Sequence, residues 1–265
     1  MKSALLLILV AAQQAAAPAP EVRFIACPVY RDTDAGRKSG CWLADDPASG
    51  GRYDVTSAPT KPDWNRAILV EGRAAAKDAG NPCGGTVLDP VRVSVLDQPC
   101  TRFMLAADGY AGRRFALPQR NVRPLYETRT PPSKPFAART ITVPFDFGSS
   151  FITYQLSDFY LDQAINYALD VQPARITVTG FAATDHDRVS GQLLVEPSSL
   201  AKERTKLVTR SLIMRGIPAG LIRESLTHRS TPSTDPAFDG LATASLRRVE
   251  VRIEPLSTPK ISSDH

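Results

Sequence analysis

Residues 141–150 read ITVPFDFGSS, and this stretch decides the fold of the C-terminal half of the chain. Its first seven residues place apolar side chains at 141, 143, 145 and 147, with Thr, Pro and Asp between them. A period of two is typical of a strand with one buried face. We therefore expect a half-buried strand over residues 141–147, followed by a loop of small residues.

A helix and a second strand follow this first strand. Ser157 offers an N-cap and Asp158 a favourable acid in the first helical turn. The helix must end before Pro173, and RITVTGF at residues 175–181 alternates again, which predicts a second strand. The apolar stripe of the expected helix consists of Leu161, Ala164, Ile165, Ala168 and Leu169.

A second helix and two further strands complete the pattern. Ser199 is expected to cap a helix that stops at residues 216–218, which read Gly-Ile-Pro. A β-prone piece at 221–227 precedes a turn-rich stretch at 230–240, and RRVEVRI at 247–253 predicts the last strand. The order β-α-β-α-β-β predicts a two-layer α/β sandwich with both helices on one face of the sheet.

Four motifs in this order resemble the OmpA-like peptidoglycan-anchoring domain family. The resemblance covers residues 141–255. An aromatic-Asp-aromatic motif with small residues lies at 145–150, and VTGFAA at 178–183 stands where the family has V-x-G-H-T-D. LAKERTKLV at 200–208 is similar to the family's L-S-x-x-R-A-x-x-V, and LRRVE at 246–250 is similar to N-R-R-V-E.

The resemblance implies a non-enzymatic domain that grips the diaminopimelate of the peptidoglycan stem peptide. In that family a helix Arg takes the ligand's carboxylate, because guanidinium binds carboxylate bidentately, and a loop Asp takes its amine. Arg204 matches the family Arg, and its spacing from Leu200 and Val208 turns it toward the apolar side of the helix. The alternative is a structural Arg204 paired with a neighbouring carboxylate.

The loop Asp of the family has no direct counterpart here. Without a gap, the family's His falls on Phe181 and its Asp on Ala183. Thr184 and Asp185 restore the Thr-Asp pair with a shift of two residues, so we take them as candidate ligand-binding residues. The alternative interpretation of residues 185–187, which read Asp-His-Asp, is a solvated loop.

The closing Arg pair supplies the last candidate. Leu246 replaces the family's Asn, and Arg247 and Arg248 point to opposite faces of the expected strand. We expect one of the two to pair structurally within the layers, and we include Arg248 among the peptidoglycan-binding candidates.

The four cysteines all lie in the first hundred residues, and their number is even. In an exported chain such a set predicts two disulfides, with three pairings open. The shortest separations between these cysteines are too long for the C-x-x-C pairs of a zinc site. The same segment contains no histidine that could activate a catalytic thiol. We expect residues 21–115 to form a small β domain, a partly closed barrel stapled by its disulfides. The cysteines are Cys27, Cys41, Cys83 and Cys100.

The N-terminus predicts export. A short basic start precedes an apolar run at residues 4–12, and small residues follow at 15–17, the layout of a secretory signal peptide over residues 1–17. The run is shorter than the roughly 20 residues that a bilayer span needs. We expect a periplasmic protein whose mature chain has no transmembrane span. An uncleaved anchor and an association with the outer membrane stay open.

A proline-rich linker is expected between the two domains. Residues 116–140 carry four prolines within twelve positions, at 124, 131, 132 and 135, which excludes a helix or a central strand there. An extended spacer is the expected state, and a proline-binding partner is the alternative. Residues 256–265 are expected to form a tail.

The composition and net charge exclude several classes of protein. With 43% apolar and 22% charged residues, the 265-residue chain is neither disordered nor a polytopic membrane protein, and its net charge of +5 does not predict nucleic acid as a partner. We expect no catalytic residue, cofactor or metal. Three hypotheses follow: a peptidoglycan binder whose N-terminal domain contacts another envelope protein, an interaction module that has lost wall binding, and a hydrolase using His186.

Overall fold

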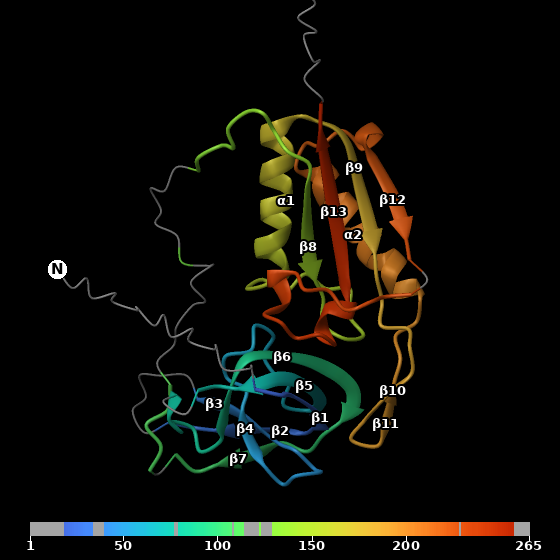
Figure 1. Cartoon of the computed structure of the whole chain (residues 1–265). Helices are drawn as coiled ribbons and strands as arrows, with labels where there is room; N and C mark the ends of the chain where they lie inside the picture. The colour runs from blue at the N-terminus through green and yellow to red at the C-terminus, as the bar shows by residue number, and fades with distance from the viewer. Residues whose placement is uncertain are drawn as a thin grey trace, which may run out of the picture.

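The structure is a computed structural model, and it describes residues 19–33, 40–76, 79–107, 109–113, 122, 129–227 and 229–256. Its elements form an N-terminal half of strands and a C-terminal half of strands and helices, which lie against each other in Figure 1. The predicted α+β class is confirmed. The predicted signal peptide, residues 116–121 and 123–128 of the predicted linker, and residues 257–265 of the predicted tail lie outside the described residues.

The N-terminal half is one curled sheet in the order β1-β5-β6-β4-β3-β2-β7. β1 and β2 follow each other directly in the chain, yet they are the first and sixth strands of the sheet. The sheet therefore curves back on itself, as expected for a partly closed barrel. Its strands are β1 Glu21–Ala26, β2 Pro28–Arg31, β3 Cys41–Asp45, β4 Arg52–Asp54, β5 Arg66–Ala74, β6 Thr86–Pro99 and β7 Phe103–Leu105.

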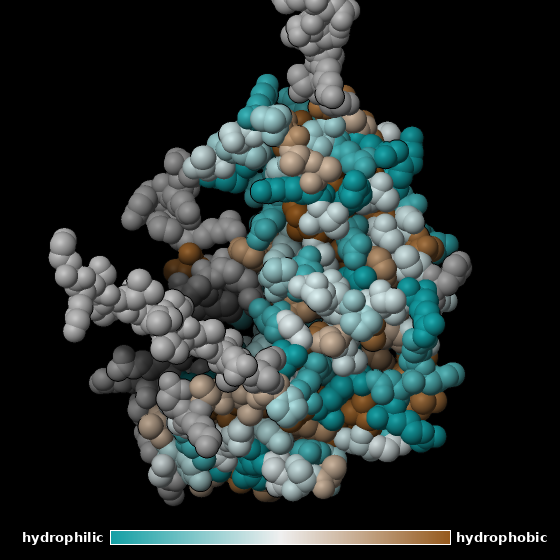
Figure 2. Space-filling model, viewed as in Figure 1, coloured by the Kyte–Doolittle hydropathy of each residue, from teal (hydrophilic) through white to brown (hydrophobic). Residues whose placement is uncertain are grey.

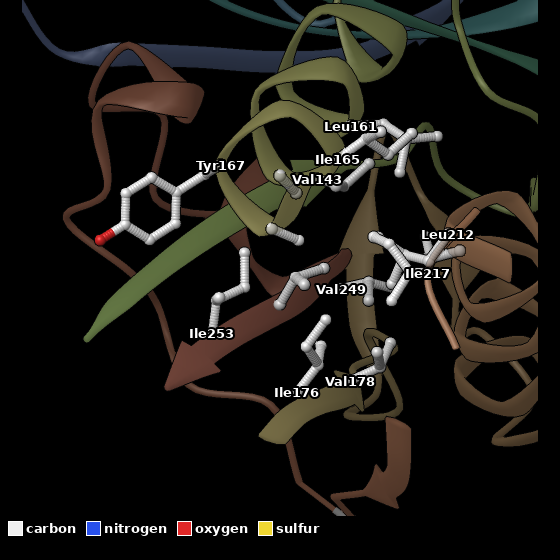
Figure 3. Close-up of a cluster of buried hydrophobic side chains, with 14 of the residues drawn as sticks. Val143, Leu161, Ile165, Tyr167, Ile176, Val178, Leu212, Ile217, Val249 and Ile253 are labelled. Carbon is white, nitrogen blue, oxygen red and sulfur yellow. The ribbon is translucent and has the colours of Figure 1, made fainter. Parts of the chain in front are cut away.

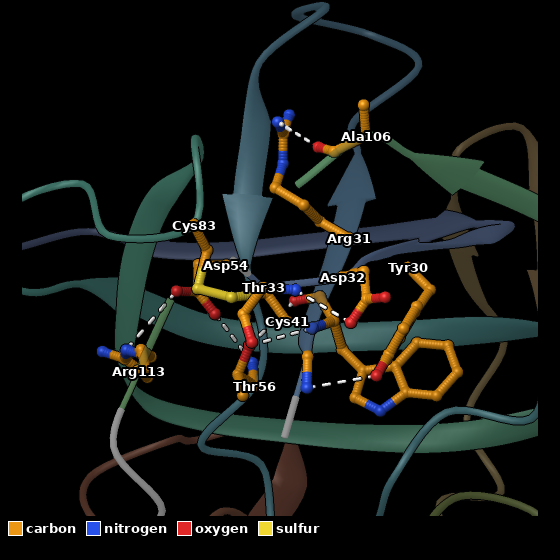
Figure 4. The surroundings of a disulfide bond; sticks show 12 residues. Tyr30, Arg31, Asp32, Thr33, Cys41, Asp54, Thr56, Cys83, Ala106 and Arg113 are labelled. Carbon is orange, nitrogen blue, oxygen red and sulfur yellow. Dashed lines mark hydrogen bonds and ion pairs between the residues drawn. A yellow bond between two sulfur atoms is a disulfide. The ribbon is translucent and has the colours of Figure 1, made fainter. Parts of the chain in front are cut away.

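Two disulfides staple this sheet, and the structure selects one of the three pairings. Cys27, at the break between β1 and β2, is bonded to Cys100 just after β6. Cys41, the first residue of β3, is bonded to Cys83 in the loop before β6, and both are fully buried (Figure 4). Each bond ties the β2–β3 side of the sheet to an end of the long strand β6.

The C-terminal half is a four-stranded sheet in the order β12-β9-β13-β8, with two helices. β12 runs parallel to β9, and β13 runs antiparallel to both of its neighbours. The predicted order β-α-β-α-β-β is present, with an unpredicted hairpin between β9 and the second helix. The elements are β8 Arg139–Pro144, α1 Ser157–Val171, β9 Pro173–Gly180, β10 Asp187–Val189, β11 Gln192–Leu194, α2 Ser199–Met214, β12 Ile222–Leu226 and β13 Arg248–Pro255.

Both helices pack on one face of this sheet, around a single apolar core (Figure 3). The alternation predicted for the last strand is confirmed, since Val249, Val251 and Ile253 are fully buried. α1 contributes Leu161 and Ile165 to this core. The core is also lined by Val143, Ile176, Val178, Val208, Leu212 and Ile217.

Four local predictions for this half were wrong. Leu169 is 45% exposed, because α1 turns Tyr167 and Val171 toward the core instead. The first strand ends at Pro144 rather than at 147. Ser157 does not cap α1, since its hydroxyl donates to the Pro144 carbonyl at 2.7 Å. Ser199 is likewise the first residue of α2 and not its N-cap, which is Ser198.

Within the described ranges, no helix has both the length and the apolar character that a bilayer span requires. The face shown in Figure 2 is mainly hydrophilic, with apolar side chains in scattered spots.

Candidate functional site

Arg204 lies on α2 and is fully buried, with 0% of its residue surface exposed. Leu200 and Val208, one turn to either side, share its face of the helix and are also buried, as their spacing predicts. All five N–H donors of the guanidinium are used. The acceptors are the carbonyls of Asp146, Ser149 and Phe181 and both carboxylate oxygens of Glu196, at 2.6–3.1 Å.

Glu196 is the partner that the sequence did not reveal. Its carboxylate accepts two hydrogen bonds from Arg204 and one each from the backbone N–H groups of Gly148 and Ala183, both at 2.8 Å. Burial alone would raise the pKa of Glu196, but the hydrogen bonds and charge of Arg204, aided by Arg247 and the Ala183 N–H, lower it below its ordinary value. The result is a four-donor carboxylate site that the chain's own side chain occupies.

A close approach of β9 to α2 positions this site. Gly180 ends β9 directly beneath the helix, where a Cβ atom would overlap the Thr205 hydroxyl and the backbone of Ala201. Only glycine permits this approach. The next residue, Phe181, is thereby placed so that its carbonyl accepts from Arg204 at 3.1 Å.

No protein-family model matches the chain, and no curated protein matches its sequence. Several solved structures are similar to it, among them the OmpA-like domain of FopA1 from Francisella tularensis subsp. tularensis SCHU S4, which is 16% identical with a TM-score of 0.35, and covers 45% of this chain and 75% of that one.

The C-terminal half is similar in fold to OmpA-like domains. Two further similar structures are the peptidoglycan-associated lipoprotein from Burkholderia pseudomallei (19% identical, 43% of this chain and 90% of that one, TM-score 0.32) and the C-terminal domain of Helicobacter pylori MotB (22%, 45% and 85%, 0.31). The OmpA-like fold is also the one that the four sequence motifs predicted.

The other candidate residues of the OmpA-like domain do not gather around Arg204. Asp185 is exposed in the loop after β9 and lies 3.5 Å from Arg229, while Thr184 is half-buried in the same loop. Arg248 is buried with its guanidinium 3.8 Å from the centre of the Phe181 ring. Among the residues that the structure describes, no hydrogen bond or ion pair joins Asp185 or Arg248 to Arg204.

Arg248 has a dense set of partners of its own. It pairs with Glu250 at 2.7 Å and donates to the Ser230 hydroxyl and to the carbonyls of Thr231 and Ser245 at 2.7–3.3 Å. These contacts fix the segment before β13 against the sheet. The side chain therefore supports the fold around Phe181 in this structure.

Arg247 pairs with a residue of the N-terminal half. Its guanidinium lies 2.5 Å from the carboxylate of Glu71 on β5, and both side chains are buried. Arg23 on β1 also pairs with Glu71, at 3.1 Å. The structural pairing expected for one Arg of the pair is therefore present, but its partner belongs to the other half of the chain.

A pocket of about 340 Å³ lies between the two halves, beside the Arg204 site. Asp146 lines it, and its carboxylate accepts from the hydroxyls of Thr60 at 2.5 Å and Thr153 at 3.2 Å. Because the Asp146 carbonyl accepts from Arg204, one loop separates the pocket from the buried ion pair. The lining also includes Pro59, Lys61, Val95, Phe147, Ser149 and Phe151.

Asp146→Asn is expected to raise the melting temperature at neutral pH. Burial raises the pKa of Asp146, against the opposing effects of Thr60 and Arg247. An acid whose pKa is raised in the folded state destabilises the protein while it is ionised, and this cost disappears as the pH falls through that pKa. The melting temperatures of wild type and variant should therefore converge at about pH 3. Thermal unfolding at both pH values checks this, with the exposed Asp185→Asn as control. An equal gain at both would contradict it.

The described part of the chain holds no group of three or more His, Cys, Asp or Glu side chains placed to bind a metal ion. His186 is exposed in the loop after β9, and His228 and His265 lie outside the described residues. What the described site can do chemically is hold a carboxylate.

Proposed function

We propose that this chain is a non-enzymatic protein of the bacterial cell envelope, exported to the periplasm, and that its OmpA-like domain associates with peptidoglycan. One observation carries the proposal: Arg204 and two backbone N–H groups hold a carboxylate with four hydrogen bonds. A carboxylate of the stem peptide's diaminopimelate needs the same donors. The site is therefore of the right chemistry, with Glu196 as its internal occupant.

The ligand has to displace Glu196 before it can reach Arg204. The side chains of both residues are fully buried, and no guanidinium donor is left over. Glu196 thus competes with any external carboxylate, and wild-type affinity for the cell wall should be low. In this proposal Asp185 and Thr184, in the loop after β9, contact the amine of diaminopimelate, while Arg248 keeps Phe181 in place.

Co-sedimentation with peptidoglycan sacculi tests the proposal on the full chain. Glu196→Gln should raise the bound fraction, because a neutral amide competes less well for Arg204 than a carboxylate does. Adding Arg204→Lys should reduce the binding again by roughly tenfold to hundredfold, the equivalent of one charged hydrogen bond at about 1.5–3 kcal/mol. Circular dichroism confirms that each variant is folded.

A folded Glu196→Gln variant that binds sacculi no better than wild type would contradict wall binding through Arg204. The second candidate function would then stand: an envelope interaction module whose OmpA-like fold no longer binds the wall. The observation that favours it is the same saturation of Arg204, interpreted as a permanent structural ion pair. In that case neither wild type nor variant binds sacculi.

A further inference from the structure

We propose that docking of the N-terminal half on the hairpin β10–β11 holds Glu196 on Arg204, so that the Arg204 site opens only when the hairpin detaches from β1 and β5. The N-terminal half is then an autoinhibitory element of the OmpA-like domain. The inhibition of peptidoglycan binding rests on the proposed function. The coupling between the hairpin and Glu196 rests only on contacts between the two halves.

The hairpin carries an apolar contact into the N-terminal half. Val189 on β10 and Leu194 on β11 are 4% and 7% exposed, and they form one buried cluster with Ile25, Ala67 and Leu69 from β1 and β5. The hairpin has only three residues in each strand. Because a two-stranded hairpin of this size is not stable alone, its seat on the N-terminal half holds it in place.

Polar contacts fix the hairpin's register on β1. Ser190 and Gly191 both have positive φ values, 48° and 78°, as in a two-residue type I′ turn. This turn presents the Ser190 hydroxyl, which accepts from the backbone N–H of Ile25 at 3.0 Å. Arg23 pairs with Asp187 at the start of the hairpin, and Gln98 bonds to Gln192 at 2.8 Å.

The seat of the hairpin fixes the position of Glu196 because only one residue separates them. Leu194 is buried against the N-terminal half, Val195 is partly exposed, and Glu196 is buried against Arg204. The backbone N–H of Glu196 also donates to the Ala183 carbonyl at 2.9 Å. The backbone that carries Glu196 is therefore restrained on both sides while Leu194 stays packed against Ile25, Ala67 and Leu69.

Further contacts between the two halves favour the closed state. Besides the buried Arg247–Glu71 pair, Arg92 on β6 donates to the Ala237 carbonyl at 2.8 Å and pairs with Asp239 at 3.0 Å. Arg73 donates to the Gly240 carbonyl at 2.6 Å. The Arg92 and Arg73 contacts involve no residue of the hairpin, so the hairpin can be released by mutation while they persist.

Amide hydrogen exchange of the full chain tests the coupling without any ligand. Val189→Glu places a charge in the apolar seat, whereas Leu193→Glu changes the same hairpin at a position that is 52% exposed. We expect Val189→Glu to speed exchange of the Gly148 and Ala183 amides, which donate to Glu196, by at least about tenfold. Leu193→Glu should leave both amides at the wild-type rate, and α2 should stay protected in both variants.

A milder variant keeps the test valid if Val189→Glu fails to fold. Asp187→Asn removes the ion pair with Arg23 while leaving the Arg23–Glu71 pair in place, and should accelerate the same two amides to a smaller degree. Wild-type protection of Gly148 and Ala183 in both variants would overturn the proposal. Faster exchange without a gain in sacculus binding would leave the coupling established and count against the proposed function alone.

Discussion

Replacing Arg204 by methionine is expected to lower the free energy of unfolding by about 3–5 kcal/mol, because it leaves the buried Glu196 carboxylate without its partner. The same change removes the donors to the carbonyls of Asp146, Ser149 and Phe181. Urea denaturation followed by circular dichroism measures the loss.

Two further variants separate the ion pair from a general effect on the helix. Arg210→Met, an exposed site on the same helix, should change the stability by no more than about 0.5 kcal/mol. The double variant Arg204→Met/Glu196→Gln should lose less than the sum of its single changes, by about 0.5–3 kcal/mol. A loss below that of Arg210→Met, or strict additivity, would show that Glu196 does not depend on Arg204.

Removing either disulfide is expected to cost about 4 kcal/mol, since each bond closes a long loop in the unfolded chain. The bonded cysteines are separated by 73 positions in Cys27–Cys100 and by 42 in Cys41–Cys83, so the first should contribute slightly more. The double variants Cys27→Ala/Cys100→Ala and Cys41→Ala/Cys83→Ala, compared by urea denaturation, check both statements.

The reduced wild-type protein is the control for these variants. In the presence of dithiothreitol it should be less stable than either double variant, because both loops are then open. A variant that matches the oxidised wild type would show that its bond contributes nothing to the stability of the curled sheet.

Periodicity predicted the secondary structure of the C-terminal half where the elements are long. The strand that carries Val249, Val251 and Ile253 follows the period of two over its whole length. The predicted burial of Leu169 was wrong because apolar residues at helical spacing do not determine which side of the helix faces the core near the helix end. The hairpin at 187–194 was missed because strands of three residues are too short to show a period, and their stability comes from contacts with β1 and β5.

The candidate site was only half predictable. The spacing around Arg204 correctly indicated a buried face, and a structural partner was one of the two interpretations. Glu196 and Glu71 were both missed, although each is a lone acid that follows an apolar run, LLV at 193–195 and AILV at 67–70. A carboxylate in such a place needs a buried cation, and only the tertiary structure shows which one it has.

The Glu71–Arg247 pair has a consequence for how this protein can evolve. Its two members lie 176 positions apart, and each is buried because the other half covers it. A substitution of Glu71 leaves Arg247 buried without a carboxylate partner, and a substitution of Arg247 leaves Glu71 with Arg23 alone, so we expect changes at 71 and 247 to occur together. Either half can be exchanged for that of a distant homologue only where the homologue carries the matching charge, and recombination within the linker with a homologue that lacks it should yield unstable chimaeras.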